Sequence, residues 1–347
     1  MNKRFYIGTY TGNSDSVGLY YLDVDFDRHE VTPIQTVAMK SPSLVAYSPD
    51  RTRLYAVQEF DTDRSMTAFS VAEGGELTLL NTATVPAIDI CHVQVAPDSS
   101  FLIGSSYGAG FVVTLKLNSD GSLGDIVTLD QHTGHGPCPE QNIPRAHCCV
   151  FDRTGKYIVS ADYGNDTLYV YTHHDGGHLE RIHRCSVPAG FAPRIVTFSL
   201  DNRHLYVVHQ NGNQVTHYTF DEATGALREK ESLTCLPEGF TAKSEGAEVQ
   251  LSPDGRFLYA SSRGADTLAT YAVAQDGTIR LLGVQSCGGE FPRHFAITLN
   301  GRYLLCGNQN GNTVTVFTRD SDTGRLSAEP VFTFPLPCPT FVLEAQR

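Results

Sequence analysis

Short apolar segments alternate along the whole chain with clusters of Asp, Asn, Gly, Pro and Ser, which predicts strands separated by turns. Residues 247–286 illustrate the pattern with four apolar segments: AEVQL, FLYASS, TLATYAV and IRLLGVQS. Each segment either alternates between apolar and polar residues or is continuously apolar. No long segment has the 3.6-residue apolar period of an amphipathic helix. The sequence therefore predicts an all-β protein.

The same outline of turn, apolar strand, polar cluster and second strand recurs seven times. Aligning the turns places the following residues at equivalent positions: Asn2, Arg51, Ser99, Gly155, Asn202, Gly255 and Gly301. Successive repeats are 46 to 56 residues apart, and each has room for four strands. Seven such repeats predict a seven-bladed β-propeller of four-stranded antiparallel blades. The chain contains no Trp, so the repeats are not of the Trp-Asp type.

The two ends of the chain are expected to share one blade. The C-terminal segment PCPTFVLE (337–344) has the pattern of an inner strand, and RFYIGTY (4–10) begins a blade that lacks one. Pairing these segments would close the ring. We therefore expect residues 1–347 to form a single propeller domain.

Polar side chains interrupt the apolar pattern at two fixed offsets from each turn. Eight residues after the turn, at the end of the second strand, stand Tyr10, Glu59, Tyr107, Tyr163, Gln210, Arg263 and Gln309. Eight and seven residues before the later six turns, at the entrance of the first strand, stand Ser43-Leu44, Cys91-His92, His147-Cys148, Arg194-Ile195, Ala247-Glu248 and Arg293-His294. Because these two strands run antiparallel along the central channel, both offsets lead to the same channel mouth. The two sets predict one site that contains His92, His147, His294, Arg194, Arg263, Arg293, Glu59, Glu248 and Gln210.

The charge balance indicates what this site binds. The chain has 26 Lys and Arg against 38 Asp and Glu, a net charge of -12, which argues against nucleic acid or an anionic membrane as partner. Three Arg residues that converge in an acidic protein instead indicate a small anionic ligand, because guanidinium groups bind carboxylate or phosphate in a bidentate manner. His and Glu residues beside them supply groups for proton transfer. Such a site requires no metal or other cofactor.

Other features of the sequence narrow the class of protein. No run of about 18 apolar residues predicts a membrane-spanning helix, and the N-terminal segment lacks the apolar core of a signal peptide. We therefore expect a cytoplasmic protein. Its nine Cys residues have no CxxC spacing and are expected to be buried, reduced thiols. The sequence does not indicate the oligomeric state.

Two local motifs are interpreted as structural. GSSYG (104–108) matches the GxSxG pattern, but a nucleophilic Ser106 would need a strand, a sharp turn and a helix, and here another strand follows. The cluster of His173, His174 and His178 flanks a Gly-Gly turn and is expected on an exposed hairpin rather than around a metal ion.

Several motifs together resemble the seven-bladed lactonase family, which includes the propeller-type 6-phosphogluconolactonase and the fungal carboxy-muconate cycloisomerase. They are YIGTYTGNSDSVG, AHCCVFDRTGKYIVSADYGND, PRIVTFSLDNRHLYVV, GAEVQLSPDGRFLYASSRGADTL and FPRHFAITLNGRYLLCGNQNGNTVTVF, and they extend over essentially the whole chain. By this resemblance the family's site residues correspond to His147, Arg194, Glu248, Arg263, Arg293 and His294.

Three positions depart from the family pattern. Arg145 replaces the first His of a His-Ala-His motif, and Ile195 replaces the His of a Pro-Arg-His motif. The family's Glu position falls on Gln210, which cannot ionise.

The resemblance implies a lactone hydrolase, similar to 6-phosphogluconolactonase, in carbohydrate metabolism and the pentose phosphate pathway. We expect catalysis by His147 as general base, Glu248 as acid and Arg194 as stabiliser of charge at the carbonyl oxygen. The remaining predicted residues would bind a small anionic lactone or sugar acid: Arg263, Arg293, His294, Gln210, His92 and Glu59. His294 is equally compatible with a role as hydrogen-bond partner. The alternatives are a cycloisomerase acting on a muconate-type diacid and a non-catalytic binding or scaffold propeller, which Gln210 favours.

Overall fold

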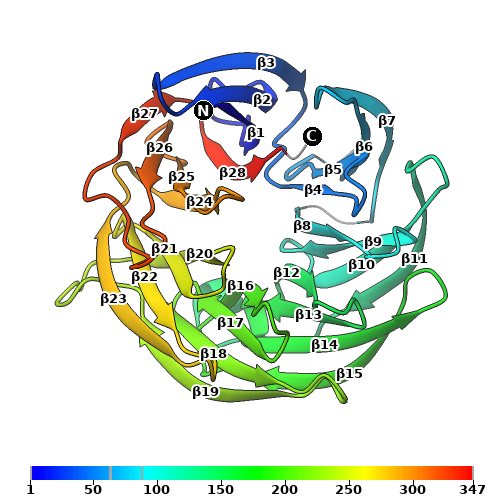
Figure 1. Cartoon of the computed structure of the whole chain (residues 1–347). Helices are drawn as coiled ribbons and strands as arrows, with labels where there is room; N and C mark the ends of the chain where they lie inside the picture. Colours follow the sequence, from blue (N-terminus) through cyan, green and yellow to red (C-terminus); the bar gives the residue numbers. More distant parts are fainter. Residues whose placement is uncertain (1, 62–64, 87–88, 346–347) are drawn as a thin grey trace.

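The computed structural model describes residues 2–61, 65–86 and 89–345, which form seven four-stranded antiparallel sheets. The sheets are the blades of a ring around a central channel (Figure 1). We number them 1 to 7 along the chain and describe each from its inner to its outer strand. The seven-bladed architecture predicted from the repeats is confirmed.

The strands have the following bounds. Blade 1 contains β28 (Pro339–Glu344), β1 (Asn2–Thr9), β2 (Gly18–Asp25) and β3 (Glu30–Ala38); blade 2 contains β4 (Val45–Tyr47), β5 (Arg53–Val57), β6 (Met66–Val71) and β7 (Leu77–Ala83); blade 3 contains β8 (Ile90–Val95), β9 (Phe101–Ser106), β10 (Phe111–Leu117) and β11 (Leu123–Gln131); blade 4 contains β12 (Ala146–Phe151), β13 (Tyr157–Asp162), β14 (Thr167–His174) and β15 (His178–Ser186). Blade 5 contains β16 (Pro193–Phe198), β17 (His204–His209), β18 (Gln214–Phe220) and β19 (Leu227–Thr234); blade 6 contains β20 (Glu245–Leu251), β21 (Phe257–Arg263), β22 (Thr267–Val273) and β23 (Ile279–Ser286); blade 7 contains β24 (Pro292–Ile297), β25 (Tyr303–Asn308), β26 (Thr313–Thr318) and β27 (Phe332–Pro335).

Strands from the two ends of the chain close the ring, as predicted. β28 pairs with β1 in antiparallel register, with Phe5 opposite Glu344 and Gly8 opposite Phe341. Lys3 also forms an ion pair with Glu344 across this contact. The C-terminal strand is thus the innermost strand of blade 1 (Figure 1).

The core lies between neighbouring blades rather than in one central layer. One apolar cluster joins Tyr55 and Val57 of blade 2 to Leu102 and Phe111 of blade 3, and similar clusters lie at other blade interfaces. The middle strands have both faces covered, which explains their continuous apolar segments, whereas outer strands such as β3 and β15 alternate between partly buried and exposed residues. Each fully buried aliphatic or aromatic side chain contributes about 1.5–3 kcal/mol.

A repeated tyrosine contact fixes adjacent blades relative to each other. In blades 1, 2, 5 and 6, a Tyr four residues after the aligned turn donates its hydroxyl proton to a glycine carbonyl in the next blade: Tyr6 to Gly75, Tyr55 to Gly121, Tyr206 to Gly277 and Tyr259 to Gly324. Glycine is required at Gly277, because its φ is +80° and an added Cβ would come within 2.3 Å of His204 Nδ1.

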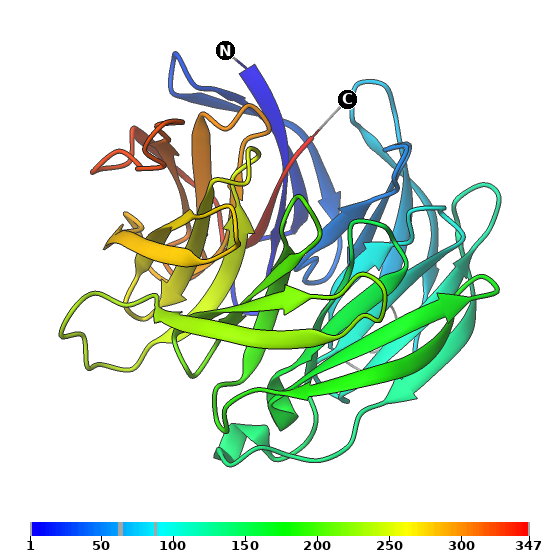
Figure 2. The ribbon, with the colours of Figure 1, turned by 60° about the horizontal axis from the view of Figure 1, so that its bottom comes forward.

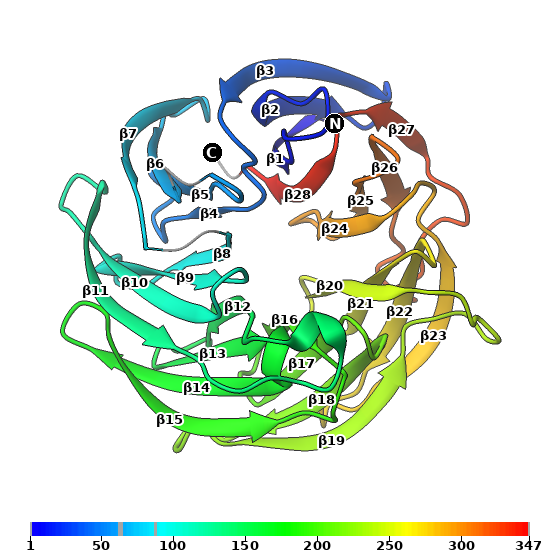
Figure 3. The ribbon, with the colours of Figure 1, turned by 180° about the vertical axis from the view of Figure 1, so that it is seen from behind.

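Helical structure in the described residues is limited to two single 3₁₀ turns, η1 (Pro139–Gln141) and η2 (Tyr163–Asn165). No helix in the described part is long and apolar enough to cross a membrane. The two turns lie against each other at one end of the ring (Figure 2), on the face that Figure 3 turns toward the viewer. As expected, Ser106 ends β9 and is followed by a turn and the strand β10, not by a helix.

Candidate functional site

An irregularity at the start of the inner strands explains why charged residues occur there at a constant offset. On β16, Pro193 pairs with His209 and Ile195 with Val208, so Arg194 between them has no partner residue on β17. The same bulge leaves Cys91, His147, Arg293 and Thr340 unpaired on their strands, and on β20 it spans Ala247 and Glu248. A bulge of this kind redirects the side chain of the extra residue. A bulge thus occurs at the start of the inner strand in every blade except blade 2, and it redirects the residues that occupy the entrance position.

In five blades a residue in the left-handed conformation lies two positions before the first entrance residue, which is Ser43, Cys91, Arg194, Arg293 or Thr340. The left-handed residues have φ between 41° and 64°, and they are Ser41, Asp89, Ala192, Phe291 and Cys338. Their carbonyl groups accept the backbone N–H of the residue that follows the second strand, for example Gln210 to Ala192 at 2.8 Å and Gln309 to Phe291 at 3.0 Å. The two sets of residues identified by their offsets are consequently held side by side.

Eight of the nine predicted site residues line two cavities that share Glu59, His147 and Arg293. The small chamber, about 30 Å³, is lined by Ser43, Leu44, Glu59, Cys91, His147, Arg194, Ile195, Glu248, Arg293, His294, Thr340 and Phe341. The large chamber, about 290 Å³, is lined by Tyr10, Glu59, Phe60, Asp89, Tyr107, His147, Gln210, Arg263 and Arg293. His92 lines neither chamber; its Nδ1 lies 3.8 Å from Cys149 Sγ.

The three arginines reach the chambers from three different blades, and two of them keep an unpaired donor. Arg194 donates to the carbonyl of Ala247, and Arg263 Nη2 lies 3.2 Å from Glu245 Oε2. Among the described residues, neither Arg194 Nε nor Arg263 Nε has a hydrogen-bond partner, although both atoms are buried. Burial and the charge of Arg293 lower the pKa of Arg194 to about 10. Buried unpaired donors are costly, so an anionic ligand would satisfy this arrangement.

Arg293 has a different environment from the other two arginines. Its guanidinium group lies over the ring of Tyr10, 4.9 Å from the ring centroid, and the Tyr10 hydroxyl donates to Glu59 Oε2 at 2.8 Å. Although burial opposes it, the negative charge of these neighbours holds the pKa of Arg293 above its usual value. Arg293 is therefore a fixed cation that belongs to both chambers.

His147 and Glu248 have pKa values displaced in opposite directions. Burial, together with the charges of Arg194, Arg293 and Arg263, holds the pKa of His147 well below its usual value, and its buried Nδ1 has no partner among the described residues. Burial raises the pKa of Glu248 to about 8, against the opposing charge of Arg194. At neutral pH the small chamber thus contains an unprotonated imidazole and a protonated carboxyl, the two states that a base and an acid need.

The rim of the large chamber contains residues that were not among the predicted site residues. Tyr10 and Tyr107 have the same offset as Glu59, Gln210 and Arg263, so the repeat itself could have identified them. Thr340 and Phe341 line the small chamber. They stand at the entrance of the closing strand β28, so the entrance offset of the repeat could have identified them as well. Phe60 follows Glu59 in a loop, and Asp89 lies two positions before Cys91, at the place of the left-handed residues; the residue types at these places vary too much for the sequence to single them out.

Arg145, the residue that departs from the family motif, lies behind this rim. Its guanidinium group is 4.9 Å from the centroid of the Tyr107 ring, and Tyr107 in turn meets His147 edge to face at 5.7 Å. Arg145 Nε donates to the Glu140 carbonyl at 2.8 Å. Arg145 therefore supports an aromatic wall of the large chamber.

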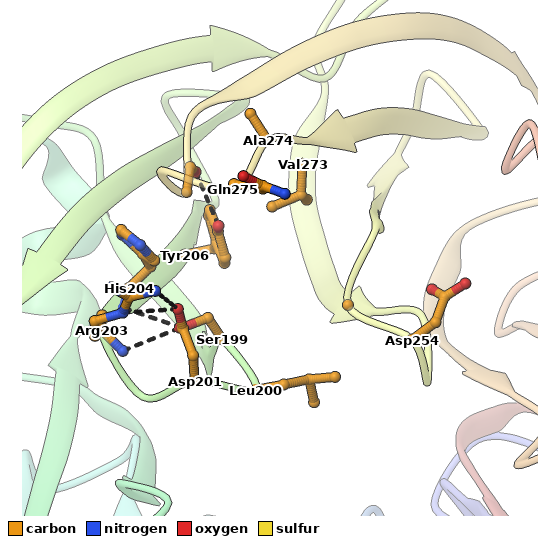
Figure 4. A pocket seen from close by; sticks show the side chains of 12 residues that line it. Ser199, Leu200, Asp201, Arg203, His204, Tyr206, Asp254, Val273, Ala274 and Gln275 are labelled. Atoms are coloured by element: carbon orange, nitrogen blue, oxygen red, sulfur yellow. Dashed lines mark hydrogen bonds and ion pairs between the residues drawn. The ribbon is translucent and has the colours of Figure 1, made fainter.

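A larger hollow lies elsewhere and does not bring the predicted residues together. It measures about 560 Å³ and lies between the turns of blades 5 and 6, with Asp254 facing Asp201, Arg203 and His204 across the gap (Figure 4). The equivalent gap between blades 2 and 3 forms a second hollow of about 230 Å³. Because the position recurs between blades, this hollow is a feature of the repeat.

The nine Cys residues, all within described segments, are free thiols; six are buried, whereas Cys138, Cys185 and Cys338 are only partly buried. His174 and His178 face each other across the β14–β15 hairpin and are exposed, as predicted, whereas the third histidine of the cluster, His173, is partly buried against Phe101 and Phe151. No group of three His, Cys, Asp or Glu residues in the described segments is arranged to hold a metal ion.

Comparisons with known proteins agree with the fold and the repeat. Residues 4–343 match the family described as "Lactonase, 7-bladed beta-propeller". A 6-phosphogluconolactonase of Bacillus subtilis is 31% identical over 94% of this chain and 93% of its own. A periplasmic gluconolactonase of Pseudomonas aeruginosa superimposes with a TM-score of 0.94 at 27% identity, covering 100% of this chain and 99% of the other. A putative 6-phosphogluconolactonase of Bacteroides uniformis has a TM-score of 0.90 at 30% identity, covering 99% of both chains. This chain is a member of the seven-bladed β-propeller lactonase family.

Proposed function

We propose that the protein hydrolyses the lactone of a sugar acid, and that its substrate is 6-phosphogluconolactone or a close relative. The observation that carries this proposal is the small chamber, where the buried, unpaired Nε–H donor of Arg194 and the unpaired Nδ1 of His147 occur together with the protonated carboxyl of Glu248. Lactone opening needs an anion-stabilising group, a base and an acid in one place. This chamber offers all three.

The reaction follows from the protonation states. His147 Nδ1 accepts a proton from a water molecule, and the oxygen of that water attacks the lactone carbonyl carbon. Arg194, with Arg263 and Arg293 nearby, stabilises the negative charge that develops on the carbonyl oxygen. The bond between the carbonyl carbon and the ring oxygen then breaks, and Glu248 gives its proton to that ring oxygen. The product is the open-chain hydroxy acid.

The large chamber would hold the rest of the substrate. Its volume of about 290 Å³ suits a single sugar ring, and Tyr10 and Tyr107 offer aromatic surfaces beside it. Arg263 and Arg293 place two cations in the same chamber, which favours a carboxylate or phosphate substituent. The Bacillus subtilis relative is a 6-phosphogluconolactonase, and this name supports the phosphorylated lactone as the first substrate to test.

One observation favours a second candidate function, in which the propeller binds a sugar acid without catalysing a reaction. Gln210 lines the large chamber at the position where the family motif has Glu, and an amide cannot exchange a proton. In that case the arginines would hold a ligand and His147 would have no chemical role. A cycloisomerase acting on a muconate-type diacid would use the same cations.

The test is a panel of 6-phosphogluconolactone, unphosphorylated aldonolactones and a muconolactone, assayed with the wild type and with His147→Ala. Spontaneous hydrolysis must be subtracted in each case. We expect the wild type to accelerate hydrolysis of a sugar lactone and His147→Ala to lose about 10²–10⁴-fold in kcat. His178→Ala, which changes an exposed histidine on the β14–β15 hairpin, serves as the matched control. If the wild type binds the acids but does not exceed the spontaneous rate on any lactone, the non-catalytic function replaces the proposal.

The cytoplasmic location expected from the sequence stays a prediction. One of the similar solved structures is described as a periplasmic gluconolactonase, so membership of the family does not fix the compartment.

A further inference from the structure

The closing strand determines which nitrogen of His294 carries hydrogen. The backbone N–H of Val342, on β28, donates to His294 Nδ1 at 3.2 Å. A backbone N–H can only donate, so Nδ1 must present its lone pair, and in a neutral imidazole the hydrogen is then on Nε2. The strand that closes the ring thereby selects one tautomer of a residue in the small chamber.

His294 is neutral and held in one orientation. Burial, with the charges of Arg194, His92 and Arg293, lowers the pKa of His294 to about 3. Its ring packs against Phe341 with the two centroids 4.1 Å apart, and only 6% of the residue is exposed. At neutral pH the His294 ring is therefore uncharged, and its packing against Phe341 holds it in place.

The hydrogen on Nε2 faces a single acceptor of the candidate site. Nε2 lies 3.7 Å from Glu248 Oε2 and 3.4 Å from Gln250 Nε2. The Gln250 amide nitrogen carries two hydrogens and cannot accept: one goes to the carbonyl of Phe295 at 2.7 Å, and the other is available to Glu248, whose pKa a hydrogen bond from Gln250 lowers. Glu248 Oε2 is therefore the acceptor within reach, at a distance somewhat longer than a formed hydrogen bond. Catalytic hydrogen bonds are often long in unliganded structures and shorten when the substrate binds.

We propose that His294 is a positioning residue for Glu248: its Nε2–H binds Glu248 Oε2 when a ligand fills the chamber, and the tautomer that permits this is set by Val342 of the closing strand. This inference rests on the proposed function. Its chemical consequence concerns the neutral carboxyl, which has one carbonyl oxygen and one hydroxyl. If Oε2 accepts from His294, the proton resides on Oε1, where it is free to pass to the leaving ring oxygen.

Two substitutions separate this role from a purely structural one. Asn at 294 can accept the Val342 N–H at the place of Nδ1 but has no donor near the place of Nε2. Gln at 294 reaches the place of Nε2 with an N–H but leaves Val342 without its acceptor. We expect His294→Asn to keep its melting temperature and lose about tenfold in kcat, with KM within about threefold. We expect His294→Gln to melt lower but to lose less than about threefold in kcat.

Coupling to Glu248 is the second readout. In a Glu248→Gln background, His294→Asn should lower kcat by less than about twofold, because the carboxyl that His294 would position is absent. The proposal is overturned if kcat falls in step with the melting temperature in both His294 variants. It is also overturned if His294→Asn lowers kcat as much in the Glu248→Gln background as in the wild type.

The third readout does not depend on turnover, so it separates this inference from the proposed function. In ¹⁵N-detected NMR of the full chain, His294 should carry its proton on Nε2 from pH 6 to 8. Titration with 6-phosphogluconate, the hydrolysis product, should shift that proton in the wild type and not in Glu248→Gln. A proton on Nδ1, or an equal shift in both proteins, would show that His294 does not position Glu248 even if lactonase activity is present.

Discussion

The Tyr10 hydroxyl donates a 2.8 Å hydrogen bond to Oε2 of Glu59, and this contact joins blade 1 to blade 2 at the channel mouth. Arg293, from blade 7, lies over the same Tyr10 ring at 4.9 Å. Three consecutive blades around the point of ring closure thus meet in one contact. The position of the cation shared by both chambers depends on this tyrosine.

Tyr10→Phe and Tyr10→Leu should therefore differ in a defined way. Phe keeps the ring beneath Arg293 and loses only the hydrogen bond, whereas Leu also loses the cation–π contact, worth about 0.5–2 kcal/mol. We expect KM for the anionic substrate to rise by less than about threefold in Tyr10→Phe and by about tenfold or more in Tyr10→Leu. Steady-state kinetics and isothermal titration with the product acid measure the two effects. Equal KM values in both variants would mean that the ring does not hold Arg293.

Arg194→Met should lower activity without lowering stability. Removing the guanidinium group takes away charge stabilisation at the carbonyl oxygen, for which we expect a loss of about 10²–10³ in kcat. Replacing a buried charge by an apolar side chain often stabilises by about 1–4 kcal/mol, which offsets the lost hydrogen bond to the Ala247 carbonyl, about 1 kcal/mol. Denaturant unfolding should show an equal or higher free energy. Arg228→Met, on the exposed outer strand β19, is the control and should change neither quantity.

The activity should fall on the alkaline side as Glu248 loses its proton. Its pKa in the folded protein is about 8, so the acid form declines as pH rises through that value, and kcat should fall about tenfold per pH unit above it. Because the pKa of His147 is well below its usual value, no acidic limb should occur near pH 6.5. Rates corrected for spontaneous hydrolysis between pH 5.5 and 9.5 test both statements, and Glu248→Gln should remove the alkaline limb.

The same carboxyl should make stability depend on pH. The folded-state pKa of Glu248 is raised above its ordinary value of 4.5, so the protonated group favours the folded state. Its contribution is fully present below about pH 4.5 and is lost as pH rises through about 8. The difference in unfolding free energy between the wild type and Glu248→Gln should accordingly move in favour of the variant between pH 5 and 9. A difference that is constant over this range would indicate an ordinary pKa for Glu248.

Gln210→Glu should not increase catalysis, although it restores the residue of the family motif. Proton transfer in the proposed reaction uses His147 and Glu248, and a new carboxylate in the large chamber would repel an anionic substrate. We expect kcat within about twofold and KM about three- to tenfold higher. Gln275→Glu, at the opposite end of the ring, adds the same charge and should leave KM unchanged. A tenfold gain in kcat would instead assign the acid or base role to position 210.

The repeat made the architecture and most of the candidate site predictable. Each of the four strands expected in residues 247–286 is present, and β20 and β21 extend the expected bounds by one or two residues. Arg194 and Arg293 could be placed because the constant distance to the turn reflects a constant bulge. The bulge itself was not predictable, since it depends on left-handed residues as different as Ala192 and Phe291.

His92 shows the limit of counting positions. It has the offset of Glu248 and His294, yet it lines neither chamber, although His92 pairs with Ser105 on β8 just as His294 pairs with Gly307 on β24. A shared offset and a shared register therefore bring a residue to the strand entrance without deciding whether its side chain enters a chamber. Tertiary loops such as the one with Asp89 are likewise set by contacts far away in sequence.

The closing pair of strands also has a consequence for the order of events during synthesis. Lys3 and Glu344, which meet across that pair, are 341 positions apart. β1 therefore leaves the ribosome long before the strand that will cover it, and the small chamber is incomplete until Thr340, Phe341 and Val342 have emerged. A nascent chain stalled before β28 lacks the Val342 N–H that selects the tautomer of His294 in our proposal, so the chemistry of the site becomes available only after residues 339–344 have left the ribosome.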